Sequence, residues 1–294
     1  MEVFSKNNNV IIKSCRNFDL DQVFDCGQCF RFEKTDGIFH GVALGRQLTL
    51  KQDGDTVILY STTLDEFNDK WRQYFDLDRD YAEVIRELSF DEQLRIAAEK
   101  TGGIRILRQD GWETLCSFII SQNNNIPRIK KIIASLCKLL GESIGDDVYT
   151  FPSAERVAAA GVEGLAPIKS GFRVKYIYDA AKKVSEGVVD LEAISKMSYT
   201  EAKEKLKTIK GVGEKVADCV LLFGYGFYEA FPRDVWVKRV IGSYYGDDFT
   251  PDYFGKNAGI AQQYLFYYER NFSKKESSLE EYTEKVQSLE SMQV

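Results

Sequence analysis

The sequence predicts an α+β protein in which an antiparallel sheet is followed by a mainly helical region. From about Val10 to Ser61, short runs of alternating apolar and polar residues are separated by Asp-Gly pairs, as in hairpins. After about residue 63, apolar residues instead recur every three or four positions, as in amphipathic helices. We expect an N-terminal sheet domain with flanking helices over residues 1–105 and a helical catalytic region over residues 106–294.

Composition and charge indicate an intracellular globular protein with a localised basic region. Of 294 residues, 44% are hydrophobic, yet no apolar run approaches the roughly 20 residues of a membrane span. Met1 to Val10 is polar and lacks a signal-peptide core. The net charge is −6, but residues 100–240 carry 22 Lys and Arg against 17 Asp and Glu. A basic middle between acidic flanks is typical of a localised nucleic-acid-binding face.

The six cysteines do not predict a metal site. Together with the single histidine, His40, they are too irregularly spaced for four ligands of one ion. The one close pair, Cys26 and Cys29, falls in a stretch that we expect to be a strand, where residues three apart point to opposite faces. A disulfide between them is therefore not expected. We expect no metal and no other cofactor.

Four strands are expected in the sheet. Their residues alternate between apolar and polar, and hairpin signals lie between them at Asp36-Gly37 and Asp53-Gly54. The expected strands are Phe30 to Glu33, Phe39 to Leu44, Gln47 to Lys51 and Val57 to Tyr60.

Only helices are expected after the sheet. Asp110 and Ser153 are placed to cap helices, and Pro127 suits the first turn of another. The segments with the clearest helical pattern are residues 64–75, 81–97, 110–119, 126–140, 153–160, 168–184, 235–245 and 251–270, with a charged tail over residues 273–294.

Residues 199–224 predict a helix-hairpin-helix. Apolar residues recur at helical spacing on both sides of a break at residues 210–213. Gly211 and Gly213 in this break can adopt positive φ or let another backbone approach closely. The amides of the break and the free N–H groups of the next helix would then face outward, where a phosphate can accept hydrogen bonds.

Two residues beyond this break suggest chemistry. Lys215 lies in the first turn of the second helix, where the macrodipole disfavours an ammonium ion and so favours the nucleophilic amine. A solvated surface lysine is the simpler alternative. Asp234 follows Pro232 and is placed to cap a helix that starts at Val235. A purely structural cap is the alternative for this residue.

The hairpin, the first-turn lysine and the proline-led aspartate together resemble the helix-hairpin-helix/Gly-Pro-Asp superfamily of DNA base-excision glycosylases. Within that superfamily, the segment FIISQNNNIPRI, from Phe118 to Ile129, resembles the 8-oxoguanine DNA glycosylases. The resemblance runs from about Asp25 to Phe266. It implies a TATA-binding-protein-like sheet domain and a partner that is double-stranded DNA containing oxidised guanine. Some relatives hold an iron–sulfur cluster beyond the aspartate, but no cysteine follows Cys219 here.

The resemblance also implies a mechanism. Lys215 would attack C1′ of the deoxyribose, displace the extruded base and leave a Schiff base, after which elimination of the 3′ phosphate nicks the strand. Asp234 would stabilise the positive charge that develops at C1′. We expect a monomer that acts near the nucleoid in a prokaryotic cytoplasm, or in the nucleus of a eukaryote.

Four residues are implied to surround the extruded base. The Gly27 carbonyl would accept the N7 hydrogen, which ordinary guanine lacks. Gln262 would meet the Watson–Crick edge. Cys219 and Phe266 would lie on the two faces of the ring.

Other residues are implied to meet the rest of the DNA. Gly211 and Gly213 would contact the DNA backbone. Asn123, Arg128 and Arg173 would contact the orphaned cytosine, and Phe172 would insert beside it. The chain departs from the family pattern at Phe172, where tyrosine is frequent, at Trp236, which replaces a histidine, and at Gln122, where serine is common.

Two other functions remain open at the level of sequence. A monofunctional alkylated-base glycosylase shares the fold but uses water and has no lysine nucleophile, so Lys215 argues against it. A non-catalytic helix-hairpin-helix protein would only grip the DNA backbone. The asparagine segment and Asp234 would then have no evident task.

Overall fold

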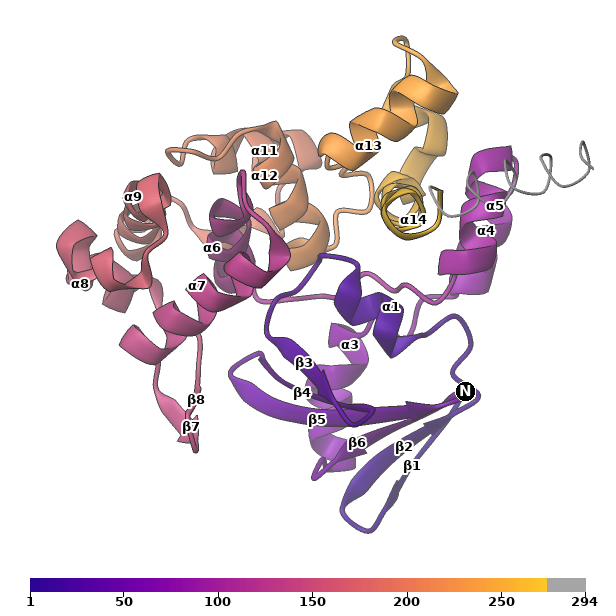
Figure 1. Cartoon of the computed structure of the whole chain (residues 1–294), viewed down its shortest axis with the longest axis horizontal. Coiled ribbons are helices and arrows are strands. Elements are labelled where there is room, and N and C mark those ends of the chain that lie inside the picture. Colours follow the sequence, from indigo (N-terminus) through magenta and orange to yellow (C-terminus); the bar gives the residue numbers. More distant parts are fainter. Residues whose placement is uncertain (274–294) are drawn as a thin grey trace, which may run out of the picture.

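The computed structural model describes residues 1–273, and their N-terminal part forms a six-stranded antiparallel sheet (Figure 1). The spatial order is β1-β2-β6-β5-β4-β3. Asp36 and Gly37 both have positive φ, 51° and 78°, as a two-residue hairpin between β3 and β4 requires. The strands are β1 (Glu2–Lys6), β2 (Asn9–Lys13), β3 (Phe32–Thr35), β4 (Ile38–Ala43), β5 (Arg46–Asp53) and β6 (Thr56–Tyr60).

Two features of this sheet differ from the prediction. The strands β1 and β2 lie outside the four that we expected, and Asn7 and Asn8 join them in a turn with φ of 51° and 58°. The stretch from Cys26 to Cys29 is not a strand, because it follows helix α1 (Leu20–Asp25), which Asp19 caps. Gly27 then turns the chain with φ of 76°.

One face of the sheet is covered by a helical segment in which a π-helical turn, η1 (Phe67–Trp71), separates α2 (Leu64–Glu66) from α3 (Arg72–Tyr74). Phe67, Trp71 and Phe75 are completely buried there against sheet residues. The stacked rings of Phe24 and Phe32 join α1 to the same core. The side chains of α1 therefore fix where the Gly27 turn begins.

The remaining elements build a second, helical core. The predicted caps Asp110 and Ser153 are confirmed, and α7 has the bounds that we expected. The helices up to the hairpin are α4 (Tyr81–Leu88), α5 (Glu92–Thr101), α6 (Gly111–Ser121), α7 (Ile126–Leu140), α8 (Ala154–Gly164), η2 (Ala166–Ile168), η3 (Gly171–Arg173), α9 (Val174–Ser185) and α10 (Leu191–Ile194). Side chains of α4 and α5 pack into this core. The division of the chain at residue 105 remains a prediction.

The expectation of helices alone was wrong in one place. A small hairpin of β7 (Ser143–Gly145) and β8 (Val148–Tyr149) follows α7. Its strands are too short to show an alternating pattern, and Asp147 turns the chain with φ of 55°.

The predicted helix-hairpin-helix is confirmed as α11 (Tyr199–Lys207) and α12 (Glu214–Val220), which continues into the π-helical turn η4 (Leu221–Tyr225). Gly211 has φ of 83°, and a side chain there would collide with the ring of Tyr176. Buried Asp218 of α12 accepts hydrogen bonds from Tyr199 Oη (2.6 Å) and Lys203 Nζ (2.9 Å) of α11. These bonds tie the two helices together.

After the hairpin come α13 (Val235–Val240), the π-helical turn η5 (Ile241–Tyr245), the 3₁₀ segment η6 (Pro251–Asn257) and α14 (Ala258–Asn271). The last helix therefore does not start at Pro251 as we expected, because Gly255 adopts φ of 59° and breaks the segment. The charged tail after Ser273 lies outside the described residues. Within residues 1–273, every helix is too short or too polar to cross a bilayer.

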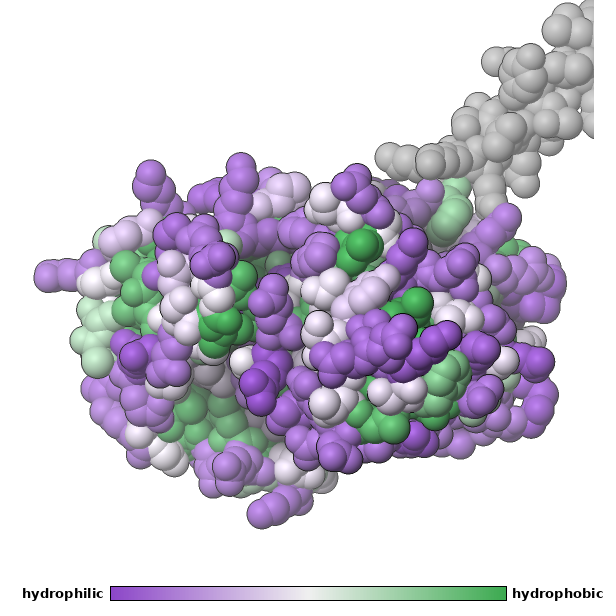
Figure 2. Space-filling model, turned by 90° about the horizontal axis from the view of Figure 1, so that it is seen from below, coloured by the Kyte–Doolittle hydropathy of each residue, from purple (hydrophilic) through white to green (hydrophobic). Residues whose placement is uncertain are grey.

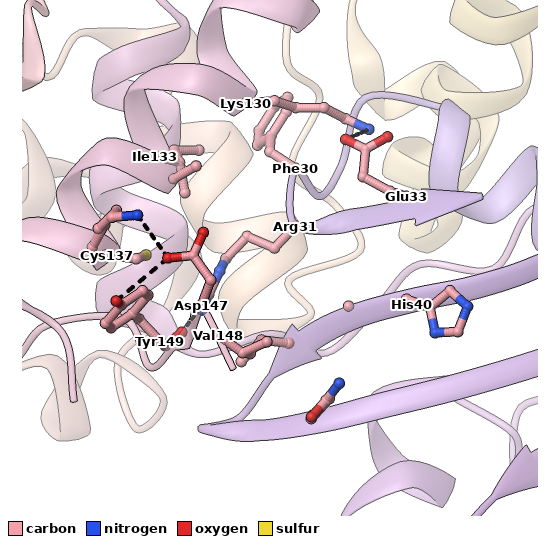
Figure 3. Close-up of a pocket in the computed structure, with 15 residues that line it drawn as sticks. Phe30, Arg31, Glu33, His40, Lys130, Ile133, Cys137, Asp147, Val148 and Tyr149 are labelled. Carbon is pink, nitrogen blue, oxygen red and sulfur yellow. Dashed lines mark hydrogen bonds and ion pairs between the residues drawn. The ribbon is translucent and has the colours of Figure 1, made fainter. Parts of the chain in front are cut away.

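The sheet, α7 and the β7–β8 hairpin line an open pocket of about 420 Å³ (Figure 3). Two residues of its lining, Lys130 of α7 and Glu33 of β3, form an ion pair at 2.9 Å (Figure 3). Deeper in this interface, Arg31 pairs with Glu113 of α6 at 3.2 Å and donates to the Tyr149 carbonyl. Figure 2 shows the molecule from below, where apolar patches are separated by hydrophilic side chains.

Candidate active site

One small pocket brings together residues from four distant parts of the chain. It lies where α12, α14, the segment before α13 and the Gly27 turn meet, with α6 on one side. Its lining includes all six residues that the sequence analysis assigned to catalysis or to the base: Gly27, Lys215, Cys219, Asp234, Gln262 and Phe266. Their individual roles remain predictions.

Lys215 lies in the first turn of α12 and is half-buried. Its ammonium group is 5.0 Å from the centre of the Phe118 ring. The nearby carboxylates Glu214 and Asp218 are both paired with Lys203. No ion pair within residues 1–273 includes Lys215. Lys215 is therefore not held in a structural ion pair in the described residues, and its role as a nucleophile remains a prediction.

Asp234 caps α13 as predicted. Its Oδ1 accepts from the backbone amides of Trp236 (3.0 Å) and Val237 (2.9 Å). Both bonds use one oxygen, which fixes the carboxylate in the pocket wall, and Oδ2 has no partner in the described part of the chain. Asp234 can therefore act as a cap and present negative charge to the pocket at once.

The base-facing candidates form a mostly apolar slot with one unpaired acceptor. Gln262 of α14 is 3% exposed, and its Oε1 has no hydrogen-bond partner within residues 1–273. Phe266 lies one helical turn further on. Burial raises the pKa of the Cys219 thiol to about 11, although the Lys215 charge acts in the other direction. The Cys219 thiol that lines the slot is therefore uncharged at neutral pH.

The cysteine pair of the Gly27 turn is also uncharged. Cys26 and Cys29 are buried free thiols, and burial raises the pKa of Cys26 to about 11. Cys26 belongs to the helical core and Cys29 to the sheet core. Among the described residues, no group of three or more His, Cys, Asp or Glu side chains could hold a metal ion.

The candidates for the opposite strand lie together outside the pocket. Asn123 and Arg128 are exposed near the start of α7, and Phe172 is 53% exposed. Arg173, however, is only 3% exposed. Its guanidinium donates to the backbone carbonyls of Ser170, Gln122 and Asn123. Burial and the charge of Arg128 lower the pKa of Arg173.

The hairpin turn is open to the outside at one of its two glycines. Gly213 has no atom within 4 Å of the position where a side chain would start. Beside it, Lys210 N–H donates to Asp179 Oδ2 at 2.7 Å, which anchors the turn on α9. The amides at the start of α12 are thus accessible to a phosphate.

The sequence analysis missed several residues that line the pocket: Cys26, Phe118, Phe223, Pro232 and Gln263. Of these, only Gln263 could have been predicted to line the pocket, because it directly follows Gln262 in the sequence. A glutamine on an otherwise apolar helix face needs a hydrogen-bond partner when it is buried.

The chain resembles known proteins over most of its length. Residues 10–115 match the model of the 8-oxoguanine DNA glycosylase N-terminal domain, and residues 116–254 match that of HhH-GPD superfamily base excision DNA repair proteins. The solved structure of MBOgg1 with a low-affinity DNA ligand is 46% identical, with a TM-score of 0.87, over 92% of this chain and 98% of that chain. The chain belongs to the 8-oxoguanine DNA glycosylase family.

Two further relatives support this family assignment. The Clostridium acetobutylicum 8-oxoguanine glycosylase/lyase, solved with double-stranded DNA containing cytosine opposite 8-oxoguanine, is 38% identical with a TM-score of 0.86, over 92% of this chain and 98% of that chain. The N-glycosylase/DNA lyase of Saccharomyces cerevisiae is 32% identical over an alignment of 250 positions, which covers 75% of this chain and 66% of the yeast protein.

Proposed function

We propose that this protein is a bifunctional glycosylase and lyase that removes 8-oxoguanine from duplex DNA and nicks the strand at the resulting abasic site. The observation that carries the proposal is the pocket in which Lys215 and Asp234 lie beside a slot lined by Gln262, Phe266 and Cys219. Chemistry on a stacked base requires that the base first leave the duplex. The pocket is where the extruded base would bind.

Lys215 is the nucleophile in this proposal. The electron pair of its free amine forms a bond to C1′ while the bond from C1′ to the base breaks, and the base leaves with the electrons of the broken bond and takes up a proton. Asp234 stabilises the positive charge at C1′ as the bond breaks. The C1′–O4′ bond then breaks, O4′ takes up the proton that Nζ loses, and a protonated imine joins C1′ to Lys215. Water removes a C2′ proton, and the electrons left behind form a C2′–C3′ double bond as the 3′ phosphate leaves.

Gln262 can meet the Watson–Crick edge of a guanine. The Watson–Crick edge of guanine carries two donors, at N1 and N2, and one acceptor, O6. The unpaired, buried Gln262 Oε1 needs a donor, because an unsatisfied buried acceptor costs roughly 1–3 kcal/mol. A guanine edge provides that donor.

The pocket also bears on the two alternatives. A monofunctional alkylated-base glycosylase has no use for an unpaired lysine at the reacting carbon, and the 3-methyladenine DNA glycosylase of Archaeoglobus fulgidus, at 22% identity, shares only the fold. A non-catalytic DNA-binding protein would have no use for the pocket. We further propose that the enzyme acts as a monomer wherever the cell keeps its DNA, at the nucleoid or in the nucleus.

Borohydride trapping tests this proposal. Borohydride reduces an imine to a stable amine, so a duplex carrying 8-oxoguanine opposite cytosine should give a covalent protein–DNA adduct. Lys215→Gln should give no adduct yet still bind the duplex. Lys196→Gln, which changes an exposed lysine, is the matched control and should trap like the wild type. A wild type that releases the base but never traps would favour the alkylated-base alternative.

A further inference from the structure

The carbonyl groups around Gly27 are unequally satisfied. The carbonyls of Asp25, Cys26 and Gln28 each accept a hydrogen bond from a side chain elsewhere in the chain. Within residues 1–273, no group donates to the Gly27 carbonyl between them. The turn therefore offers a single free acceptor, and that acceptor belongs to a residue that lines the pocket.

Two of these donors come from one helix, α14. Gln263 Nε2 donates to the Cys26 carbonyl at 2.5 Å, and Arg270 Nη2 donates to the Asp25 carbonyl at 2.6 Å. The two side chains are seven residues apart, which places them on the same face two turns apart. Gln263 is 2% exposed. Arg270 also pairs with the Asp25 carboxylate and lies 5.4 Å from the centre of the Phe266 ring.

On its other side, the turn is anchored to the chain segment between the two cores. The Gln28 side chain donates to the Val23 and Arg105 carbonyls and accepts from Leu107 N–H. Gln28 is therefore fixed. Asp25 ends α1, and Cys26 N–H donates to the Gln22 carbonyl of that helix at 3.0 Å, whereas the carbonyls of Asp25 and Cys26 are bound by the two α14 side chains. Gly27 itself has φ of 76° and no side chain to restrain it. The two α14 contacts hold the carbonyls directly before Gly27, so they contribute to the direction of its own carbonyl.

We propose that Gln263 and Arg270 are positioning residues for lesion specificity: they hold the Gly27 turn so that its free carbonyl faces the base position set by Gln262 and Phe266. The inference rests on the proposed function. Because all four residues lie on α14, the helix that binds the guanine edge and one ring face also sets the position of the acceptor for the N7 hydrogen. A hydrogen bond tolerates little error in distance or angle, so loosening the turn reduces recognition of the lesion before it affects Lys215.

The test compares two reactions of each variant under single-turnover conditions. Excision of 8-oxoguanine requires base recognition, whereas nicking of a pre-formed abasic site does not. The measured quantity is the ratio of the two rates, because a general loss of folded enzyme lowers both alike. Gln263→Met keeps the length of the side chain and removes its donor. We expect this variant to lower the ratio about tenfold, because a hydrogen bond to the lesion depends on the positioned carbonyl.

Two further variants complete the test. Arg270→Gln removes the second contact at a less buried site, and it should lower the ratio in the same direction even if Gln263→Met does not fold. Gln73→Met is the matched control, because it makes the same change at an exposed site on α3, away from the Gly27 turn. It should keep the wild-type ratio. Wild-type ratios in both α14 variants would overturn the inference, whereas a wild type that excises no 8-oxoguanine would overturn the proposed function itself.

Discussion

At the scale of single residues, Gly27 combines an unusual backbone conformation with a proposed role in recognising the base. Its φ of 76° is strained for any other residue. A methyl group there would lie 3.7 Å from Phe266 Cε1, an ordinary contact. A side chain would therefore disturb the turn through the backbone rather than by collision.

We predict that Gly27→Ala lowers the rate of 8-oxoguanine excision about tenfold or more, because the carbonyl that would accept the N7 hydrogen moves and a bond of roughly 1–3 kcal/mol is weakened. Single-turnover assays on a lesion duplex measure this rate. Nicking of a pre-formed abasic site should continue. Gly242→Ala is the control, since Gly242 has open space around it and no positive φ. Unimpaired excision by Gly27→Ala would show that recognition lies elsewhere.

A pocket residue could be predicted from the sequence where it belongs to a recognisable motif. Lys215 follows the hairpin glycines, and Asp234 follows a proline and precedes an apolar helix. The contact between Gln263 and Cys26 spans 237 residues. No local pattern marks the two ends of such a contact, so this part of the pocket could only be found in three dimensions.

At the scale of elements, the caps were the most reliable signals. Asp110, Pro127 and Asp234 stand where the structure starts α6, α7 and α13. The errors fall on short elements. The strands β7 and β8 have three and two residues, too few for any period to show, and the stretch from Cys26 to Cys29, expected to be a strand, is the turn that follows α1.

The first turn of α6 carries an ionisable group whose pairing crosses to the sheet domain. Burial raises the pKa of Glu113 to about 7, against the opposing effect of Arg31. In the unfolded chain this carboxyl titrates near pH 4.5. Between these two values the folded protein holds a proton that the unfolded chain has released. Rising pH therefore favours unfolding in this window.

We predict that the wild type loses stability relative to Glu113→Gln as pH rises from about 4.5 to about 7. Over this range, the difference between their free energies of unfolding should change by an amount on the order of 1–3 kcal/mol. Urea unfolding at a series of pH values measures it. The exposed Glu163 provides the control, because Glu163→Gln should show no such trend. A constant difference between wild type and Glu113→Gln would mean that this carboxyl is ionised throughout the range.

At the scale of the whole molecule, charge is distributed unevenly. The net charge is −6, while the basic excess lies in residues 100–240. That range contains the hairpin turn, the start of α7 and η3. A molecule that is acidic overall can therefore present a basic face to DNA.

We predict that affinity for duplex DNA falls as salt is added, despite the negative net charge, because binding releases counterions from phosphates. Fluorescence anisotropy at several salt concentrations gives the slope of log affinity against log salt. Arg128→Ala should reduce the size of this slope by about 1 if its charge meets a phosphate. Lys51→Ala, an exposed site on the sheet, should leave it unchanged. Affinity that does not respond to salt would rule out binding through the basic region.

The contacts from α14 to the Gly27 turn also bear on the order in which the protein is made. Residue 27 leaves the ribosome early, and N-terminal parts of a chain generally fold first during synthesis. The hairpin with Lys215 emerges later, and Gln263 and Arg270 emerge after it. A nascent chain can thus contain Lys215 while the Gly27 turn still lacks its α14 contacts. On the proposal made above, discrimination between damaged and normal guanine is acquired only once α14 has emerged and packed against the turn.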